Sequence, residues 1–330
     1  MSRRREDRRE ATLRGPSAKD GSGESAVSAG ARPVRAVALD RFGLLCAVLA
    51  AVGFSGKAIL VKLAYRYGVD AETLLALRMA FSLPFFVALG WIGAGRASSR
   101  LTPRDGAWLG GLGFLGYYLA SYLDFLGLRY ISAGLARLIL FVYPTLVVLL
   151  ATLGLGQPLT RRVLGALALC YAGIALAVAH DLRLANTARD LALGGVLVFG
   201  SALSYALYLL GNGRVVGRLG ALRVTALASL VACGLGIGQF LLLRPPTALV
   251  QPGPVLGLAL TMALFSTVLP VWGVAEAIRR LGPGLVALTS SLGPIVTLLL
   301  AWLLLDEAWG VAQLTGAALV IAGVIVMARR

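Results

Sequence analysis

Charged residues are scarce in this chain. They make up 14% of its 330 residues, whereas an average soluble domain contains about 25%. Hydrophobic residues account for 58%, and the mean hydropathy is +0.83. A soluble fold of this size would need far more polar surface to cover its core. The composition therefore excludes an ordinary soluble domain and predicts a protein that crosses a membrane several times.

Residues that build catalytic and metal sites are also rare. The three cysteines, Cys46, Cys170 and Cys233, lie in apolar blocks without metal-ligand spacing, and His180 is the one histidine. An intramembrane enzyme would need a nucleophile with a base, or two carboxylates, converging at membrane depth. The sequence offers neither a histidine-containing dyad nor an aspartate pair, so we expect no enzyme and no cofactor. A transport-like scaffold without flux stays open as an alternative.

Acidic residues are outnumbered two to one, 15 against 31 lysines and arginines, which gives a net charge of +16. Ten of the basic residues lie at or before Arg41. No basic face with interleaved aromatic residues is visible, so we expect no nucleic-acid partner. Residues 1–40 are rich in Arg, Ser, Gly and Ala without hydrophobic periodicity, which predicts a disordered, basic tail. The apolar block that starts at Phe42 is too long for a signal-peptide core and is expected to stay as a helix.

Long apolar blocks fill the rest of the chain. Each approaches the length of about 20 residues that a helix needs to cross a bilayer. We therefore predict an all-α membrane protein with ten transmembrane helices. Their predicted ranges are 42–64, 72–93, 106–128, 133–155, 161–180, 191–211, 222–243, 254–277, 283–305 and 309–328.

The loops between these blocks differ in charge. If the basic tail is cytoplasmic, the loops on its side hold twelve arginines and those on the opposite side hold five. Cytoplasmic loops are enriched in basic residues, so both termini are predicted to be cytoplasmic. Abundant Ala, Leu, Gly and Arg with three lysines is typical of GC-rich bacteria, so the expected location is the bacterial inner membrane. The twelve are Arg96, Arg100, Arg104, Arg161, Arg162, Arg214, Arg218, Arg223, Arg279, Arg280, Arg329 and Arg330, and the five are Arg66, Arg129, Arg183, Arg189 and Arg244.

The sequence repeats itself after 150 residues. GLARLILFVYP (134–144) aligns with GLVALTSSLGP (284–294), and YPTLVVLLATLGLGQ (143–157) aligns with GPIVTLLLAWLLLDE (293–307). We therefore predict two five-helix repeats, 41–185 and 186–330. Because five is odd, the second repeat must enter the membrane inverted relative to the first. Many secondary transporters are built this way, with a substrate site near the midplane between the halves.

These residues resemble the EamA-type module of the drug/metabolite transporter superfamily, over about 42–328. In that module the fourth helix follows a short turn of small residues, carries a central proline and ends on Glu or Gln. The arginine early in the family's second helix matches Arg78. The corresponding fourth-helix residues are Ser132, Ala133, Gly134, Pro144 and Gln157 in the first copy, and Pro283, Gly284, Pro294 and Glu307 in the second.

The resemblance implies transport of small metabolites, often amino acids or related compounds and often outward. We expect a secondary transporter that works by alternating access, with a small-molecule substrate and membrane lipid as partners. GFSGK (53–57) lacks the spacing of a phosphate-binding loop, so ATP drive is not indicated. Related small pumps that export lipophilic cations rely on a first-helix glutamate. No acidic residue lies between Phe42 and Tyr67, which leaves multidrug or cationic efflux as the weaker alternative.

Pro144 and Pro294 occupy matched positions inside the fourth helix of each repeat. A proline within a membrane helix removes a backbone hydrogen bond and frees a carbonyl. The pair predicts two bent or broken helices that act as conformational hinges beside one cavity. Ser290 and Ser291 precede the second proline where the first copy has apolar residues, so they are candidates for the cavity wall.

Ionisable residues within apolar blocks are costly, at roughly 2.5–3.5 kcal/mol at a helix centre, and often functional. We predict Lys57, Arg78, Asp124 and Arg137 as substrate-binding residues. Lys57 lies nine residues, or about 14 Å, from Arg66, too deep to reach the interface easily. Arg137 is expected near the external mouth, where it either binds an anionic substrate group or anchors the helix end in the headgroups.

Asp124 lies close enough to Arg129 in sequence for a plain ion pair, and Glu276 lies similarly close to Arg279 and Arg280. Even so, the predicted cluster carries an excess of positive charge. A substrate with a carboxylate or phosphate group is therefore the expected partner.

Two further patterns are expected to be structural. Gly111, Gly113 and Gly116 spell GxGxxG but lie in an apolar helix, where small residues serve close helix packing. A set of aromatic residues could line a cavity, although core packing or interface anchoring fits them better. They are Tyr117, Tyr118, Tyr122, Tyr143, Tyr205, Tyr208 and Trp272.

Overall fold

The computed structural model describes residues 40–95, 101–155, 160–182, 187–307 and 310–328. Within these ranges it contains helices, turns and loops and no β-strand, as the predicted all-α class requires. Several residues used in the sequence predictions lie outside the described ranges. They are the tail up to residue 39, Arg96, Arg100, Gln157, Arg183, Arg329 and Arg330.

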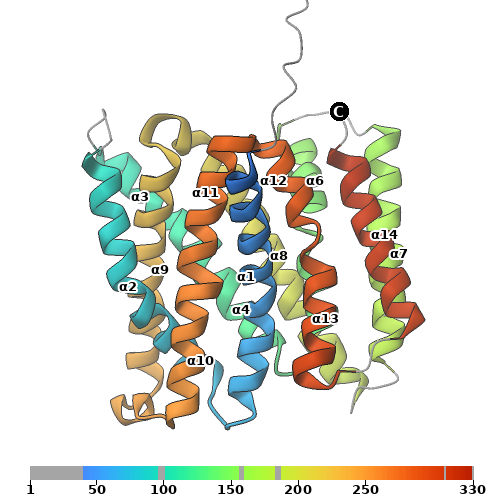
Figure 1. Cartoon of the computed structure of the whole chain (residues 1–330), viewed down its shortest axis with the longest axis horizontal. Coiled ribbons are helices and arrows are strands. Elements are labelled where there is room, and N and C mark those ends of the chain that lie inside the picture. The colour runs from blue at the N-terminus through green and yellow to red at the C-terminus, as the bar shows by residue number, and fades with distance from the viewer. Residues whose placement is uncertain (1–39, 96–100, 156–159, 183–186, 308–309, 329–330) are drawn as a thin grey trace, which may run out of the picture. The chain divides into compact units, whose positions relative to one another are not determined.

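Helices lie in each of the ten predicted blocks (Figure 1). The first half of the chain contains α1 (Arg41–Tyr65), α2 (Ala71–Gly95), α3 (Pro103–Leu112), the π-helix η1 (Gly113–Leu119), α4 (Ala120–Gly127), α5 (Ala133–Leu140), α6 (Tyr143–Leu155) and α7 (Arg161–Asp181). The second half contains α8 (Ala188–Leu219), α9 (Ala221–Leu243), the short 3-10 helix η2 (Pro246–Leu249), α10 (Gly253–Ala263), the π-helix η3 (Leu264–Val268), α11 (Leu269–Leu281), α12 (Pro283–Ser290), α13 (Gly293–Leu305) and α14 (Val311–Ala328).

Seven helical segments of the described chain are long and apolar enough to cross a membrane. They are Arg41–Tyr65, Ala71–Gly95, Ala133–Gly154, Arg161–Asp181, Ala188–Leu219, Ala221–Leu243 and Gly253–Leu281. Gly293–Leu305 and Val311–Val326 are shorter apolar helices. The chain is therefore a multi-pass membrane protein by its helices, and seven of the ten predicted spans meet the full test of length and hydropathy.

The helices run side by side between two ends. We call the end that holds Arg41 the near end, at the top of Figure 1, and the end that holds Tyr65 the far end. α2 and α9 pack along each other, as do α7 and α14, while α1 packs against α11 and α13. Because α1 contacts helices of the second half along its length, the centre of the bundle is shared by the two halves of the chain.

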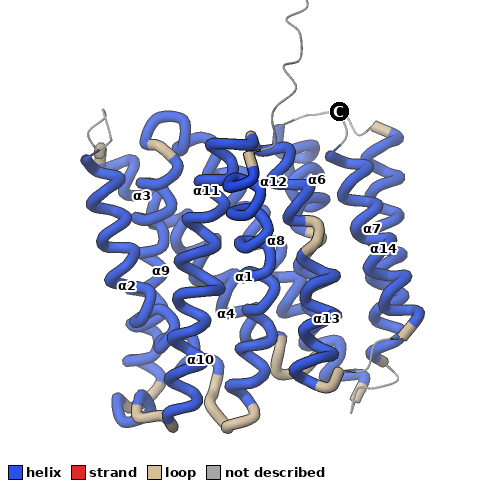
Figure 2. The backbone as a smooth tube through the Cα atoms, viewed as in Figure 1, coloured by secondary structure: helices blue, strands red, loops and turns tan. Residues whose placement is uncertain are grey.

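Helix irregularities repeat at the 150-residue offset found in the sequence. The π-helix at Gly113–Leu119 has its counterpart at Leu264–Val268. The helix that holds Pro144 is interrupted at residues 141–142, and the one that holds Pro294 at 291–292 (Figure 2). The two copies thus share their distortions as well as their sequence pattern, which is the architecture expected of two repeats.

Local capping explains where several helices begin. Thr102 starts α3 with a capping box in which its hydroxyl accepts from the Asp105 N–H while the Asp105 carboxylate accepts from the Thr102 N–H. Ser132 and Thr160 accept in the same way from the third residue of α5 and α7. These short polar side chains satisfy backbone donors that would otherwise face an apolar medium.

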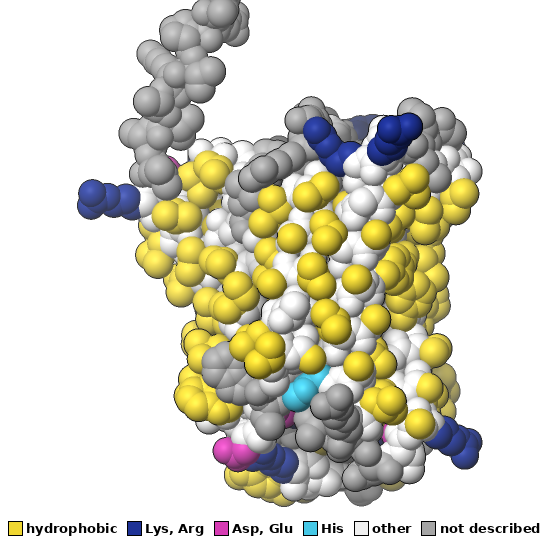
Figure 3. Space-filling model, turned by 90° about the vertical axis from the view of Figure 1, so that its right-hand side faces the viewer, with side chains coloured by type: hydrophobic (Ala, Val, Ile, Leu, Met, Phe, Trp, Pro, Cys, Tyr) yellow, Lys and Arg dark blue, Asp and Glu magenta, His cyan; other side chains and the backbone are white. Residues whose placement is uncertain are grey.

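The surface between the two ends is apolar. Figure 3 shows hydrophobic side chains over the face that α7 and α14 form, with basic side chains gathered towards its ends. Large apolar side chains are exposed elsewhere on the surface too: Trp91 is 84% exposed and Leu242 is 87% exposed. Water would penalise such a surface, whereas bilayer lipid covers it without cost.

The GxGxxG stretch serves packing, as predicted. A Cβ atom on Gly113 would lie 2.4 Å from the Ala228 carbonyl oxygen, and one on Gly116 would lie 2.4 Å from the Tyr208 ring. Nothing lies within 4 Å of the corresponding position on Gly111. Two of the three glycines therefore bring η1 close to α8 and α9.

Candidate functional site

A buried ion pair between α1 and α4 forms the core of the candidate site. Lys57 Nζ lies 2.7 Å from Asp124 Oδ2, and the two side chains are only 17% and 4% exposed. Lys57 is eight residues, about 12 Å, from the far end of α1. The sequence left open an ion pair between Asp124 and Arg129 alongside a place for Asp124 in the charged cluster. The structure places Asp124 against Lys57, because α4 turns its carboxylate inward towards α1. No local sequence signal reports this long-range packing.

Arg78 of α2 lies beside this pair. Its side chain is buried, and its guanidinium carbon lies 4.9 Å from the centre of the Phe125 ring. Since Phe125 directly follows Asp124, α4 presents a carboxylate to Lys57 and an aromatic face to Arg78. Arg78 interacts electrostatically with Asp124, yet its buried Nε has no hydrogen-bond partner in the described structure.

Arg137 of α5 approaches the site from another side. A Cβ atom on Gly293 would lie 2.6 Å from Arg137 Nη2, so the guanidinium rests against the first residue of α13. The expectation of an arginine that anchors a helix end in the headgroups is therefore corrected: the side chain reaches the break in the α12–α13 helix. Like Arg78, it has a buried Nε without a hydrogen-bond partner among the described residues.

The break at residues 291–292 is held by α1 through Ser55. The Ser55 hydroxyl lies 3.0 Å from the Gly293 carbonyl oxygen and 2.6 Å from the Ala51 carbonyl oxygen, and Thr297 Oγ1 donates to the Ser55 carbonyl. Ser55 is two residues from Lys57, which links the broken helix to the ion pair. The sequence interpretation did not single out Ser55. A small polar residue two positions from a buried lysine was the available signal.

The predicted wall residues lie at the same break. Ser290, the last residue of α12, donates its hydroxyl to the Val286 carbonyl of its own helix, and Ser291 is buried. Pro144 and Pro294 each occupy the second position of a half-helix, α6 and α13. There a proline removes no helical hydrogen bond, because its N–H would be unpaired anyway. The two helices are thus fully broken before the proline rather than bent at it.

Four tyrosines continue from Arg137 towards the near end. The Tyr143 and Tyr205 ring centres lie 5.0 Å apart, those of Tyr205 and Tyr208 5.5 Å, and the Tyr117 and Tyr208 hydroxyls 3.0 Å apart. Arg137 lies near Tyr143 and Tyr205. These rings pack together in the interior, whereas Trp272 is exposed. The sequence interpretation named these tyrosines without seeing that α3–α4, α6 and α8 bring them together.

Glu307 connects the two repeats at the far end. Its carboxylate accepts from the backbone N–H groups of Ala133, at 3.0 Å, and Gly134, at 3.4 Å, and lies 3.3 Å from Lys62 Nζ. The end of α13 thereby caps the start of α5. Negative charge at a helix N-terminus is favourable. Beside this contact, a cavity of about 370 Å³ lies among Lys62, Tyr65, Arg66, Leu128, Arg129, Leu305 and Glu307.

A second carboxylate lies at the same helix start. Asp181, the last residue of α7, is buried, and its Oδ2 accepts from the Ser132 N–H at 3.3 Å. Glu276, by contrast, forms ion pairs with Arg279 and Arg280 at the near end. Glu276 therefore has the structural ion-pair role that its nearness to Arg279 and Arg280 in the sequence predicted.

A further set of ion pairs lies at the far end, where Asp70 belongs to the loop between α1 and α2 and Glu72 to the first turn of α2. Arg244, which follows α9, lies 3.6 Å from Asp70 and 3.4 Å from Glu72. Partial burial raises the pKa of the Asp70 carboxyl, but hydrogen bonds from Thr73 and the charge of Arg244 outweigh it and hold the pKa below its ordinary value. Asp70 is therefore ionised at neutral pH and joins the loop to α9.

Comparison with known proteins shows the same two-fold organisation. The EamA-like transporter family matches the chain twice, over residues 41–179 and 192–329. The chain is 28% identical to the uncharacterised transporter YcbK of Bacillus subtilis over 290 residues, covering 83% of this chain and 88% of that protein. It is 26% identical to the uncharacterised transporter YyaM of the same organism over 215 residues, covering 65% and 70%. One solved structure, titled "Crystal structure of protein", has a similar fold, with a TM-score of 0.60 and 20% sequence identity. The alignment covers 87% of this chain and 99% of the chain in that structure.

Proposed function

Because the chain belongs to the EamA-like transporter family, we propose that it is a secondary transporter that exports a small metabolite with a carboxylate or phosphate group, such as an amino acid, by alternating access. Lys57, Arg78, Asp124 and Arg137 form the substrate site in this proposal, with Ser290 and Ser291 at its edge.

The charge balance of the site is the observation that supports an anionic substrate. Lys57 and Asp124 neutralise each other at 2.7 Å. Arg78 and Arg137 have no carboxylate within ion-pair distance in the described structure, and each keeps a buried Nε without a partner. Burying a charge without a counter-charge is costly. A substrate anion would supply the missing charge for these two guanidinium groups.

The same balance argues against cationic compounds. Asp124 is the carboxylate of this cluster, and Lys57 already occupies it. A lipophilic cation would have to displace Lys57 and would then face Arg78 and Arg137 as well. Efflux of cations therefore remains the weaker alternative.

The broken helices support alternating access. α5–α6 and α12–α13 are interrupted at matched positions, and Arg137 joins one half-helix of the first repeat to the break in the second. At the far end, Glu307 holds α13 to the start of α5. We propose that this contact opens when the substrate leaves, while Pro144 and Pro294 keep each pair of half-helices independently mobile.

The membrane arrangement in this proposal has ten spans in two inverted repeats, 41–185 and 186–330, with both termini in the cytoplasm of a bacterial cell. The near end is then the cytoplasmic end. Seven apolar helices, the two shorter apolar helices and the helical segment of residues 103–127 together supply the ten spans.

Counterflow in proteoliposomes tests the proposal. Vesicles containing the full chain are loaded with candidate amino acids, organic acids or sugar phosphates, and uptake of the matching labelled compound is measured. We expect flux for at least one acid and none for its neutral amide or dephosphorylated analogue. Arg78→Gln and Arg137→Gln should each abolish that flux, whereas Arg41→Gln, at the exposed start of α1, should leave it intact. Equal flux of the acid and its neutral analogue would overturn the anionic substrate class.

A further inference from the structure

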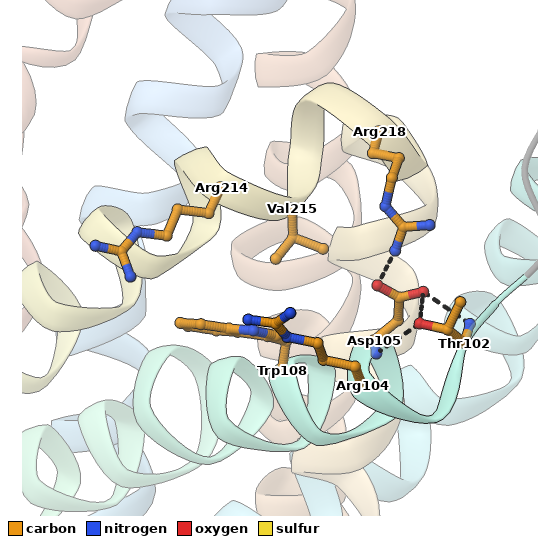
Figure 4. Close-up of a pocket in the computed structure, with 7 residues that line it drawn as sticks. All are labelled: Thr102, Arg104, Asp105, Trp108, Arg214, Val215 and Arg218. Carbon is orange, nitrogen blue, oxygen red and sulfur yellow. Dashed lines mark hydrogen bonds and ion pairs between the residues drawn. The ribbon is translucent and has the colours of Figure 1, made fainter.

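A second basic cavity lies at the near end, apart from the candidate substrate site. It has a volume of about 400 Å³ and is lined by Thr102, Arg104, Asp105, Trp108, Arg214, Val215 and Arg218. Figure 4 shows the residues of α3 facing those of α8 across the cavity. Three arginines and one aspartate leave it with an excess of positive charge.

Contacts between the lining side chains hold the walls of this cavity in place. Asp105 closes the capping box with Thr102 and also pairs with Arg218 across the cavity. Arg214 lies with its guanidinium carbon 5.9 Å from the Trp108 ring centre. Arg104 and Trp108 are four residues apart on α3 and so share a helix face. One arginine is therefore fixed by a carboxylate, while Arg104 and Arg214 flank the indole without a carboxylate of their own in the described structure.

The depth of the cavity points to the lipid headgroups. α8 has 32 residues, which corresponds to about 48 Å, whereas the hydrocarbon core of a bilayer is about 30 Å thick. The apolar part of α8 precedes its last turns, and those turns hold Arg214 and Arg218. The arginines consequently lie beyond the hydrocarbon core, at the level of lipid phosphates, and Trp108 has the amphipathic character of a residue at that interface.

Two residues of the α3 wall are not repeated in the second half of the sequence. At the 150-residue offset, Arg104 corresponds to Pro254 and Trp108 to Leu258. Features shared by both repeats serve their common mechanics, whereas the arginine and the indole that α3 contributes here are found in the first repeat and not at the matching positions of the second. The repeat symmetry therefore does not account for this pair of residues.

We propose that this cavity binds a phosphate group, supplied by the headgroup of an anionic phospholipid in the near-end leaflet. Arg104 and Arg214 contact the phosphate oxygens, and the pair of Arg218 with Asp105 joins the α8 wall to the α3 wall. Planar guanidinium groups suit phosphate because two N–H donors can meet two oxygens. Basic pockets between membrane helices bind anionic headgroups in this way.

Native mass spectrometry of the full chain in detergent tests the proposal, by titration with phosphatidylglycerol or phosphatidylcholine. The unchanged chain should bind phosphatidylglycerol about tenfold or more tightly than phosphatidylcholine. Arg104→Gln combined with Arg214→Gln should reduce that preference to about twofold or less, while retaining the Asp105–Arg218 pair. The matched control, Arg41→Gln with Arg161→Gln, removes the same charge from exposed near-end positions and should keep the preference.

A second arm separates lipid from soluble phosphate. Inorganic phosphate and glycerol phosphate, added in excess during the lipid titration, should not compete with phosphatidylglycerol. Complete competition would overturn the lipid as the source of the phosphate group. If the control pair loses the preference as fully as the cavity pair, the cavity is not the binding site. Should the double variant fail to purify as a monodisperse species, Arg214→Gln alone should show an intermediate loss, and an unchanged preference would contradict the proposal.

Discussion

Arg78 and Arg137 each hold a buried guanidinium nitrogen that bonds to nothing in the described structure. At the scale of single residues this is the main departure from a satisfied interior, since buried polar groups are normally paired. Lys57 and Asp124, by contrast, form an ion pair at 2.7 Å. The site therefore combines an internal ion pair with two cations that lack a protein counter-ion. Substitutions in the ion pair and at the two cations are expected to have different effects.

Removing Lys57 alone should leave Asp124 as an unpaired buried carboxylate and lower the amount of protein in the membrane, because breaking a buried pair is costlier than removing both partners. Lys57→Ala combined with Asp124→Ala should restore abundance, but transport should stay at background. Quantitative immunoblotting and counterflow measure the two effects separately. Full transport by the double variant would show that the pair only stabilises the fold.

Gly293 offers a finer test of Arg137. A methyl group there would overlap the end of the Arg137 side chain, 2.6 Å from Nη2. That end is flexible, so Gly293→Ala should fold and displace the guanidinium without removing its charge. We expect a half-saturation concentration raised by about tenfold, equivalent to about 1.4 kcal/mol, with abundance unchanged. The neighbouring substitution Ile295→Val, on an exposed face, serves as the control. An unchanged half-saturation would place Arg137 outside the substrate site.

At the scale of elements, the broken helices are the feature to explain. In α12–α13, the Leu292 N–H bonds to the Thr289 carbonyl and the Val296 N–H to the Leu292 carbonyl, so the hydrogen-bond ladder restarts at the break. In α5–α6, the Val142 N–H bonds to the Ile139 carbonyl and the Leu146 N–H to the Val142 carbonyl. The same pattern in both repeats means that each proline lies just after an interruption and prevents the ladder from closing over it.

Pro144→Ala should restore a donor that can bond to the Leu140 carbonyl, four residues earlier, and so favour a continuous helix. We expect a lower maximal transport rate, by about threefold or more, with little change in half-saturation, because movement rather than binding is affected. Pro294→Ala should act in the same direction. Initial-rate measurements over a range of substrate concentrations check this. A raised half-saturation at an unchanged maximal rate would assign Pro144 to binding rather than movement.

At the scale of the whole molecule, helices of both repeats enclose one interior. α1 contacts α5 of its own repeat and α11, α12 and α13 of the other, and Glu307 ties the repeats together at the far end. The four charged residues of the candidate site come from the first repeat, and the second repeat packs against them through the α12–α13 break. If these helices cross the membrane, as proposed, the near and far ends face opposite sides of it.

Single-cysteine labelling tests this arrangement. Thr160 and Thr247 are exposed and lie at the near and far ends respectively. In a background without Cys46, Cys170 and Cys233, a membrane-impermeant thiol reagent should label Thr247→Cys in intact cells. It should label Thr160→Cys after permeabilisation alone. Labelling of both in intact cells would contradict the opposite placement of the two ends.

The sequence by itself determined the membrane class, the helical fold, the positions of the helical segments and the duplication. These properties follow from hydropathy, block length and self-similarity, which can be read locally or by comparing one part of the chain with another. It also singled out Lys57, Arg78, Asp124 and Arg137 by their cost in an apolar block. The tertiary structure alone decided their partners. Asp124 turns to Lys57 rather than Arg129, Arg137 reaches Gly293 rather than the headgroups, and Ser55 holds the break. Contacts between residues as far apart as 55 and 293 depend on how helices pack side by side, and in lipid that packing is set by shape and hydrogen bonding, which hydropathy does not encode.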